Sequence, residues 1–170
     1  MLTIEQSYVK KMMLLGLLTS VLVIASSWFL AAEFRLESAN QLPARLKVYL
    51  LTLFISVIPL AILISRIASK RFFGSAISGD SSDPVVEIDI KVLNNTHEQF
   101  QLFAVASLIL SAGLSEGRIA MPMVLAVAFC FYRFLFWFGY HKNPCMRAFG
   151  FATTFYSNLI LLVFSVWLII

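Results

Sequence analysis

Charged residues are scarce in this chain of 170 residues: they make up 13% of it, whereas 60% of the side chains are apolar. A soluble domain typically has about 45–50% apolar residues. Because so few charges cannot cover a water-facing surface, the composition excludes a soluble domain. The chain has a net charge of +4 but no long run of basic residues, so its charge does not indicate nucleic-acid binding. A modest positive charge is compatible with contact to lipid head groups. We expect one integral membrane domain in a lipid bilayer and no nucleic-acid partner.

The chain also lacks the residue patterns of disulfide frameworks and metal sites. Its two cysteines, Cys130 and Cys145, form no CxxC pair, and we interpret both as free thiols. His97-Glu98 begins like the HExxH zinc motif, but Gln101 stands where the second histidine is required. His141 is interpreted as an interfacial residue. We therefore expect no metal.

Long apolar runs are abundant. A transmembrane helix needs about 20 predominantly apolar residues, because the hydrocarbon core is about 30 Å thick. Five stretches approach or meet this requirement, at residues 12–32, 48–65, 99–115, 119–140 and 148–170. Pro59 predicts a kink in the second, and a helical pattern reaching back to Val85 predicts that the third helix protrudes from the membrane. The predicted fold class is an all-α integral membrane protein.

The predicted organisation is an N-terminal extension, residues 1–47, followed by a helical membrane domain, residues 48–170. The extension holds one additional transmembrane helix at about residues 12–32 and a loop. Its apolar run is longer than the 7–15 residues usual in a signal peptide, so we expect a retained anchor, with cleavage as the alternative. Small polar residues predict a mobile cytosolic loop at about residues 70–84, and Asn143-Pro144 predicts a tight turn between two helices.

The orientation follows from the distribution of lysine and arginine, which favour the cytosolic side. Five spans put eight basic residues on the face of the N-terminus and four on the other. The eight are Lys10, Lys11, Arg66, Lys70, Arg71, Lys91, Lys142 and Arg147, and the four are Arg35, Arg45, Lys47 and Arg118. We expect a cytosolic N-terminus, a lumenal or extracellular C-terminus, and an unmodified Asn94 although Asn94-Asn95-Thr96 is a formal glycosylation acceptor. The membrane is predicted to be an endomembrane or the plasma membrane.

Polar residues gather at the cytosolic end of the third and fourth spans. Lys91, Asn95 and Glu98 follow the spacing i, i+4, i+7 and share one helix face. Arg133 lies within an apolar run, where an arginine costs about 2.5–3.5 kcal/mol at mid-membrane and normally finds a partner. We expect Glu98 to pair with Arg133. Such a pair can be purely structural, so these residues alone leave the function open.

Two motifs resemble those of the MAPEG superfamily, the membrane-associated proteins in eicosanoid and glutathione metabolism. Lys91-x-x-x-Asn95-x-x-Glu98 is similar to the family's basic-x-x-x-Asn-x-x-Glu signature. Arg133, followed by Gly139-Tyr140 and then Arg147, is similar to a second family motif. The resemblance covers roughly residues 48–170, and the additional N-terminal helix looks closest to the mattrin-like branch.

This resemblance implies a four-helix bundle per subunit, assembled as a homotrimer that holds glutathione between neighbouring subunits near the cytosolic face. It implies that glutathione contacts Lys91, Asn95, Glu98, Arg133, Tyr140 and Arg147. Arg71 resembles the basic end of a family helix that can stabilise the glutathione thiolate, so Arg71 and Arg147 are the candidate catalytic residues.

Three positions depart from the catalytic members that the chain resembles. Lys91 replaces an arginine, and a lysine lacks the planar fork that binds a carboxylate with two hydrogen bonds. Phe136 stands where active branches carry a polar ring, and Ala148 where some carry a hydroxyl. Two hypotheses therefore remain: a non-catalytic or weakly active mattrin-like member in membrane trafficking or receptor regulation, with an unknown membrane-protein partner, or a glutathione-dependent transferase or peroxidase acting on lipophilic electrophiles.

Overall fold

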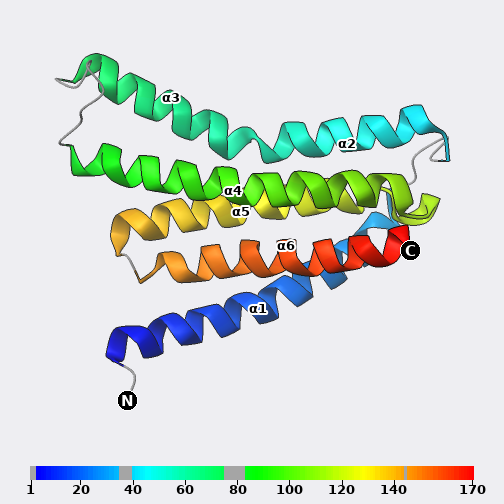
Figure 1. Ribbon diagram of the computed structural model, residues 1–170, viewed down its shortest axis with the longest axis horizontal. Coiled ribbons are helices and arrows are strands. Elements are labelled where there is room, and N and C mark those ends of the chain that lie inside the picture. The colour runs from blue at the N-terminus through cyan, green and yellow to red at the C-terminus, as the bar shows by residue number, and fades with distance from the viewer. Residues whose placement is uncertain (1–2, 35–39, 75–82, 144) are drawn as a thin grey trace.

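The computed structural model describes residues 3–34, 40–74, 83–143 and 145–170, and these residues form helices and short connections without a strand. Figure 1 shows the helices side by side in an elongated bundle, with α2 and α3 forming one bent rod. The helices are α1 (Ile4–Ala31), α2 (Leu42–Ser56), α3 (Ile58–Phe73), α4 (Pro84–Gly113), α5 (Met121–Lys142) and α6 (Arg147–Ile169), with a 3₁₀ turn, η1, at Glu116–Arg118. The all-α prediction is confirmed.

The predicted kink separates α2 from α3. Val57 ends α2, and Pro59 lies in the first turn of α3, where its missing N–H donor is tolerated. The second span ends later than predicted, because α3 continues to Phe73 with Lys70 and Arg71 in its last turn, where the helix dipole favours cations. Residues 70–73 of the predicted loop are therefore helical. Its centre, residues 75–82, lies outside the described residues.

Four segments of the described chain are long and apolar enough to cross a membrane: Ile4–Ala31, Leu42–Phe73, Glu116–Lys142 and Arg147–Ile169. The third predicted span, residues 99–115, is not among them: it is the C-terminal half of α4, whose N-terminal half carries charged residues. Asp83 caps α4 by accepting a hydrogen bond from the Val85 backbone N–H at 2.8 Å. Figure 1 shows α3 and α4 extending beyond the neighbouring ends of α5 and α6.

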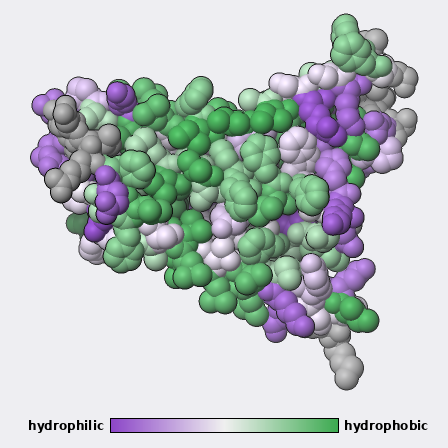
Figure 2. Space-filling view, turned by 180° about the vertical axis from the view of Figure 1, so that it is seen from behind, coloured by the Kyte–Doolittle hydropathy of each residue, from purple (hydrophilic) through white to green (hydrophobic). Residues whose placement is uncertain are grey.

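The molecular surface is divided into an apolar belt and two polar ends. Figure 2 shows hydrophobic side chains across the middle of the visible face and hydrophilic side chains at both ends. Large apolar side chains such as Leu22, Phe54, Phe131 and Val163 are exposed in this structure. Lipid tails can cover them, so the surface is that of an integral multi-pass membrane protein.

Glycines let α5 and α6 pack with their backbones in contact. A Cβ atom at Gly150 would lie 2.6 Å from the Phe136 backbone nitrogen, and one at Gly139 would lie 2.9 Å from the Met146 carbonyl oxygen. Asn143 is extended, and its side chain accepts a hydrogen bond from the Cys145 N–H at 2.8 Å. The close packing brings the first turn of α6 against the end of α5.

The N-terminal helix is longer than predicted and lies against α6. It begins at Ile4 rather than Met12, because Thr3 and Gln6 form a capping box at its start. Gly16 permits the closest approach, since a Cβ there would lie 2.6 Å from the Cβ of Ala152. Nearby, the Ser20 hydroxyl donates a hydrogen bond to the Thr153 carbonyl at 2.8 Å.

A second contact holds α1 at its C-terminal end. The Arg118 guanidinium donates a hydrogen bond to the Trp28 carbonyl at 2.7 Å and lies 4.9 Å from the centroid of the Trp28 ring. An arginine over an aromatic ring is attracted by the negative face of the ring. The N-terminal helix is thus packed at two separate points on the bundle formed by the other helices.

Candidate functional site

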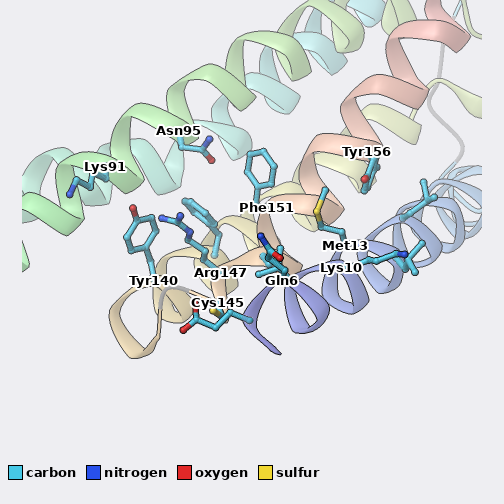
Figure 3. A pocket seen from close by; sticks show the side chains of 16 residues that line it. Gln6, Lys10, Met13, Lys91, Asn95, Tyr140, Cys145, Arg147, Phe151 and Tyr156 are labelled. Atoms are coloured by element: carbon cyan, nitrogen blue, oxygen red, sulfur yellow. The ribbon is translucent and has the colours of Figure 1, made fainter. Parts of the chain in front are cut away.

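A cavity of about 870 Å³ lies between the N-terminal half of α1 and the facing ends of α4, α5 and α6. Its volume is within the range of about 300–1,000 Å³ found for small-molecule sites. Four of the six predicted ligand-binding residues line it: Lys91, Asn95, Tyr140 and Arg147. Figure 3 shows Lys91, Tyr140 and Arg147 close to one another at one side of the cavity.

Arg147 is the cavity residue best placed to bind an anion. It is the first residue of α6, and its guanidinium carbon lies 4.3 Å from the centroid of the Tyr140 ring. This stacking holds the guanidinium plane in one orientation. Within the described part of the chain the guanidinium has neither an ion-pair partner nor a hydrogen-bond acceptor. Its N–H groups are therefore free to donate to a carboxylate.

Lys91 is engaged by a neighbour on its own helix. Its ammonium lies 2.6 Å from a carboxylate oxygen of Glu87, one helical turn earlier, and both side chains are exposed. The pair holds the pKa of the Glu87 carboxyl below its ordinary value and raises the pKa of Lys91. An anionic ligand at Lys91 has to share the ammonium with Glu87 or displace it.

Arg133 lies beneath the cavity wall rather than in it. The side chain is 1% exposed and donates hydrogen bonds to Asn95 Oδ1 at 2.9 Å and to Thr96 Oγ1 at 3.2 Å. Its guanidinium carbon also lies 4.2 Å from the centroid of the Phe136 ring. Asn95 and Phe136 both line the cavity, so Arg133 supports two residues of the wall without reaching the cavity itself.

The predicted direct ion pair between Glu98 and Arg133 is wrong. Glu98 is exposed, and its carboxylate accepts a long hydrogen bond, 3.4 Å, from the Asn95 amide nitrogen. The amide of Asn95 therefore lies between the two charged groups, donating to one and accepting from the other. The cause is geometric, since Arg133 reaches α4 on its buried side whereas Glu98 points outward.

Neither Glu98 nor Arg71 is among the side chains that line the cavity. Arg71 belongs to the last turn of α3, which packs against α4 and α5. Its Nε atom is buried without a hydrogen-bond acceptor in the described part of the chain. One chain therefore does not bring Arg71 to the cavity that contains Arg147.

The positions that depart from the catalytic pattern do line the cavity. Phe136 and Ala148 are buried and present only carbon atoms to it. Cys145 and Tyr156, both half-buried, complete this side of the wall and were not identified as cavity residues from the sequence. The lining of the cavity thus combines a few charged side chains with largely apolar ones.

The contribution of α1 was also missed. Seven of its residues line the cavity, namely Glu5, Gln6, Val9, Lys10, Met13, Leu14 and Leu17. The available signal was the pair Gly16 and Ser20, whose spacing of four residues places small side chains on one helix face and is typical of helix contacts in membranes. Gln6, Val9 and Met13 continue that face toward the N-terminus.

A buried carboxylate at the neighbouring helix ends was not predicted either. Asp89 is fully buried and accepts hydrogen bonds from Arg66 Nε and Trp137 Nε1, both at 2.8 Å. His141 Nε2 lies 2.7 Å from the same carboxylate, so His141 is a partner of Asp89 rather than only an interfacial residue. The cluster ties α3, α4 and α5 together at the end that holds the cavity.

The partners of Asp89 determine its ionisation. Burial alone raises the pKa of the carboxyl, but the hydrogen bonds from His141, Arg66 and Trp137 together lower it by more. The pKa therefore lies below its ordinary value, and Asp89 is charged at neutral pH.

Within the described residues no three His, Cys, Asp or Glu side chains are grouped so that they could hold a metal ion.

Comparison with known proteins identifies one relationship. The model of the MAPEG family matches residues 46–167, which include most of α2 and nearly all of α6. The matched region contains all the predicted site residues but excludes α1. No curated protein and no solved structure is significantly similar to the chain.

Proposed function

The chain belongs to the MAPEG family of membrane proteins, and on that basis we propose that its cavity binds glutathione. The observation that carries the proposal is the convergence of Lys91, Asn95, Tyr140 and Arg147 on one cavity of suitable volume. These residues come from three helices and include an arginine without an anionic partner in the described chain.

The chemistry of glutathione matches this wall. The tripeptide carries two carboxylates, one ammonium group, two amides and a thiol. Arg147 can donate two parallel hydrogen bonds to a carboxylate, and Lys91 adds positive charge beside it. Asn95 and the Tyr140 hydroxyl supply neutral polar groups. In this proposal Arg133 and Glu98 position Asn95 rather than contact the ligand.

We further propose that the protein is non-catalytic or weakly active. A conjugating enzyme stabilises the glutathione thiolate with nearby hydrogen-bond donors or cations. Phe136 and Ala148, which lie in the cavity wall, offer no such donor. A role in membrane trafficking or receptor regulation, as the resemblance to the mattrin-like branch implies, then requires ligand binding without turnover and a membrane-protein partner.

One observation favours the alternative, a glutathione-dependent transferase or peroxidase. Met13, Leu17 and Phe151 line the cavity beside its basic residues, so a lipophilic electrophile could lie next to a bound thiol. Arg147 would then lower the thiol pKa, because a cation within a few ångströms favours the thiolate. Arg71 could join the site only from another copy of the chain, since it lies outside the cavity of its own.

A homotrimer with a cytosolic N-terminus completes the proposal. The trimer rests on the family resemblance, and closed homo-oligomers of this kind are common. The excess of lysine and arginine on the N-terminal side supports the orientation. The cavity would then open toward the cytosol, where glutathione is abundant.

The test is the thermal stability of the purified protein in mild detergent with and without millimolar glutathione. A ligand that binds only the folded state raises the melting temperature. We expect Arg147→Ala to abolish that rise while leaving the ligand-free melting temperature nearly unchanged. Lys142→Ala is the matched control, because Lys142 is an exposed cation near the same turn but outside the cavity. No rise for the parent protein would refute the proposal.

Turnover of an aryl chloride by the same preparation separates the two functional classes. A protein that binds glutathione and conjugates it no faster than free glutathione in buffer supports the non-catalytic function. Efficient conjugation that is lost in Arg147→Ala would establish the transferase instead.

A further inference from the structure

The N-terminal half of α1 forms a complete side of the cavity, although it lies outside the region that matches the family. The close contact of α1 with α6 is at Gly16 and Ser20. On the N-terminal side of this contact, Gln6, Lys10 and Met13 line the cavity. Figure 3 shows α1 along one side of the cavity and α4, with Lys91 and Asn95, along the opposite side.

The charges around the cavity point to a ligand contact on α1. Three cations, Lys10, Lys91 and Arg147, and one carboxylate, Glu5, line it. Lys91 is paired with Glu87 at 2.6 Å, whereas Lys10 and Arg147 have no ion-pair partner in the described residues. Two free cations on different helices match a ligand with two separated carboxylates better than a ligand with one.

We propose that α1 is part of the ligand site: Lys10 binds one carboxylate of glutathione while Arg147 binds the other. The inference rests on the proposed binding of glutathione and adds a residue that the family match does not cover. Gln6 lies one turn before Lys10, and its amide oxygen is engaged by the Thr3 N–H at 2.9 Å. Its amide N–H groups remain available to a ligand carbonyl.

The apolar part of the same helix face sets the shape of the site. Met13 is half-buried and lines the cavity one turn beyond Lys10. Its flexible side chain can adjust to a ligand, and a larger rigid side chain there would occupy the cavity. A single chain therefore supplies two facing walls of the cavity, one from α1 and one from α4.

The first experiment compares two adjacent lysines. Lys10→Gln and Lys11→Gln remove the same charge from the same helix, but only Lys10 lines the cavity, and both side chains are exposed. Calorimetric titration of the full chain in nanodiscs with glutathione should show binding weakened about two- to fivefold for Lys10→Gln, the effect of losing a solvent-accessible ion pair. Lys11→Gln should bind like the parent.

Two analogues of glutathione assign the contact to a carboxylate. One is the glycyl ethyl ester, and the other replaces the γ-glutamyl residue by 4-aminobutyrate, which lacks the α-carboxylate. Each should bind the parent more weakly than glutathione. In Lys10→Gln one of the two analogues should show no further loss relative to glutathione, because the carboxylate it lacks has already lost its partner.

The second experiment uses shape instead of charge. Met13→Trp places a large ring in the cavity, whereas Leu15→Trp places the same ring at an exposed position outside it. We expect Met13→Trp to weaken binding and Leu15→Trp to leave it unchanged. The melting temperatures of the ligand-free variants control for misfolding.

The outcomes are distinguishable. A parent protein that does not bind glutathione overturns both the proposed function and this inference. A parent that binds glutathione while Lys10→Gln and Lys11→Gln behave alike, and Met13→Trp binds normally, overturns the inference alone. In that case α1 is an anchor whose cavity-facing side does not touch the ligand.

Discussion

Replacing Asn95 should destabilise the ligand-free protein more than replacing Glu98, although Glu98 is the charged residue. Asn95 Oδ1 accepts a hydrogen bond of 2.9 Å from Arg133 Nη2, and Arg133 is 1% exposed. Arg133 Nη1 already has no acceptor within the described chain. Asn95→Ala would therefore leave both terminal nitrogens of a buried guanidinium unpaired.

The magnitude follows from the kind of bond that is lost. A hydrogen bond to a charged group contributes about 1.5–3 kcal/mol, whereas interhelical bonds in one membrane protein average about 0.6 and reach about 1.7 kcal/mol. We expect a loss of about 2 kcal/mol for Asn95→Ala, since the group left behind is charged and buried. Glu98→Gln removes an exposed charge bonded to Asn95 at 3.4 Å and should cost less than about 0.5 kcal/mol.

The assay is reversible unfolding in mixed micelles, with free energies compared among single variants without glutathione. Asn94→Ala is the matched control, because Asn94 is the exposed neighbour on the same helix and the structure gives it no hydrogen bond. A direct ion pair would instead make Glu98→Gln the costly change, at about 3–5 kcal/mol. That order, or equal losses for Asn94→Ala and Asn95→Ala, would refute the bridging role of Asn95.

Three further predictions concern the packing of α1, the buried carboxylate and the topology. Gly16→Leu should cost at least about 1–3 kcal/mol in unfolding experiments, because a Cβ there would lie 2.6 Å from a side chain of α6, while Gly117→Ala, with open space around it, should be nearly neutral. Asp89→Asn should destabilise the protein at neutral pH. Because the pKa of Asp89 is lowered, its stabilising contribution is present above the ordinary carboxyl pKa and is lost as the pH falls through the lowered value. The unfolding free energy of the variant should therefore decline less toward acid pH than that of the parent, and equal declines would contradict this. A glycosylation acceptor appended after Ile170 should be modified in a eukaryotic membrane while Asn94 stays bare, and the reverse pattern on a gel would overturn the orientation.

Features that depend on a short stretch of sequence were predicted well. The break at Pro59 and the backward extension of α4 follow from backbone geometry and helical periodicity, which are local. The grouping of Lys91 with Asn95 on the cavity side of α4 has the same origin, because residues four apart share a helix face. Helix ends were less accurate: the first helix starts earlier than its apolar run, since its capping box consists of polar residues.

Features that depend on contacts between helices were not predicted. Asp89 was not singled out from the sequence, yet Arg66, Trp137 and His141 surround its carboxylate. The error over Glu98 has the same cause, because the spacing along α4 does not reveal how α5 is rotated against it. That rotation decides whether Arg133 meets a carboxylate or an amide.

An all-α membrane protein, and a set of polar residues that are candidates for its site, could be inferred without any structure, because the length of apolar runs and the spacing of residues on a helix are local properties. Which of these candidates meet depends on how the helices pack against one another. Gly16 and Gly150 have no side chain, so α1 and α5 can each approach α6 closely at these positions. This packing places Lys10 and Arg147, which are far apart in the sequence, on the same cavity. It leaves Arg133 buried beneath the cavity wall.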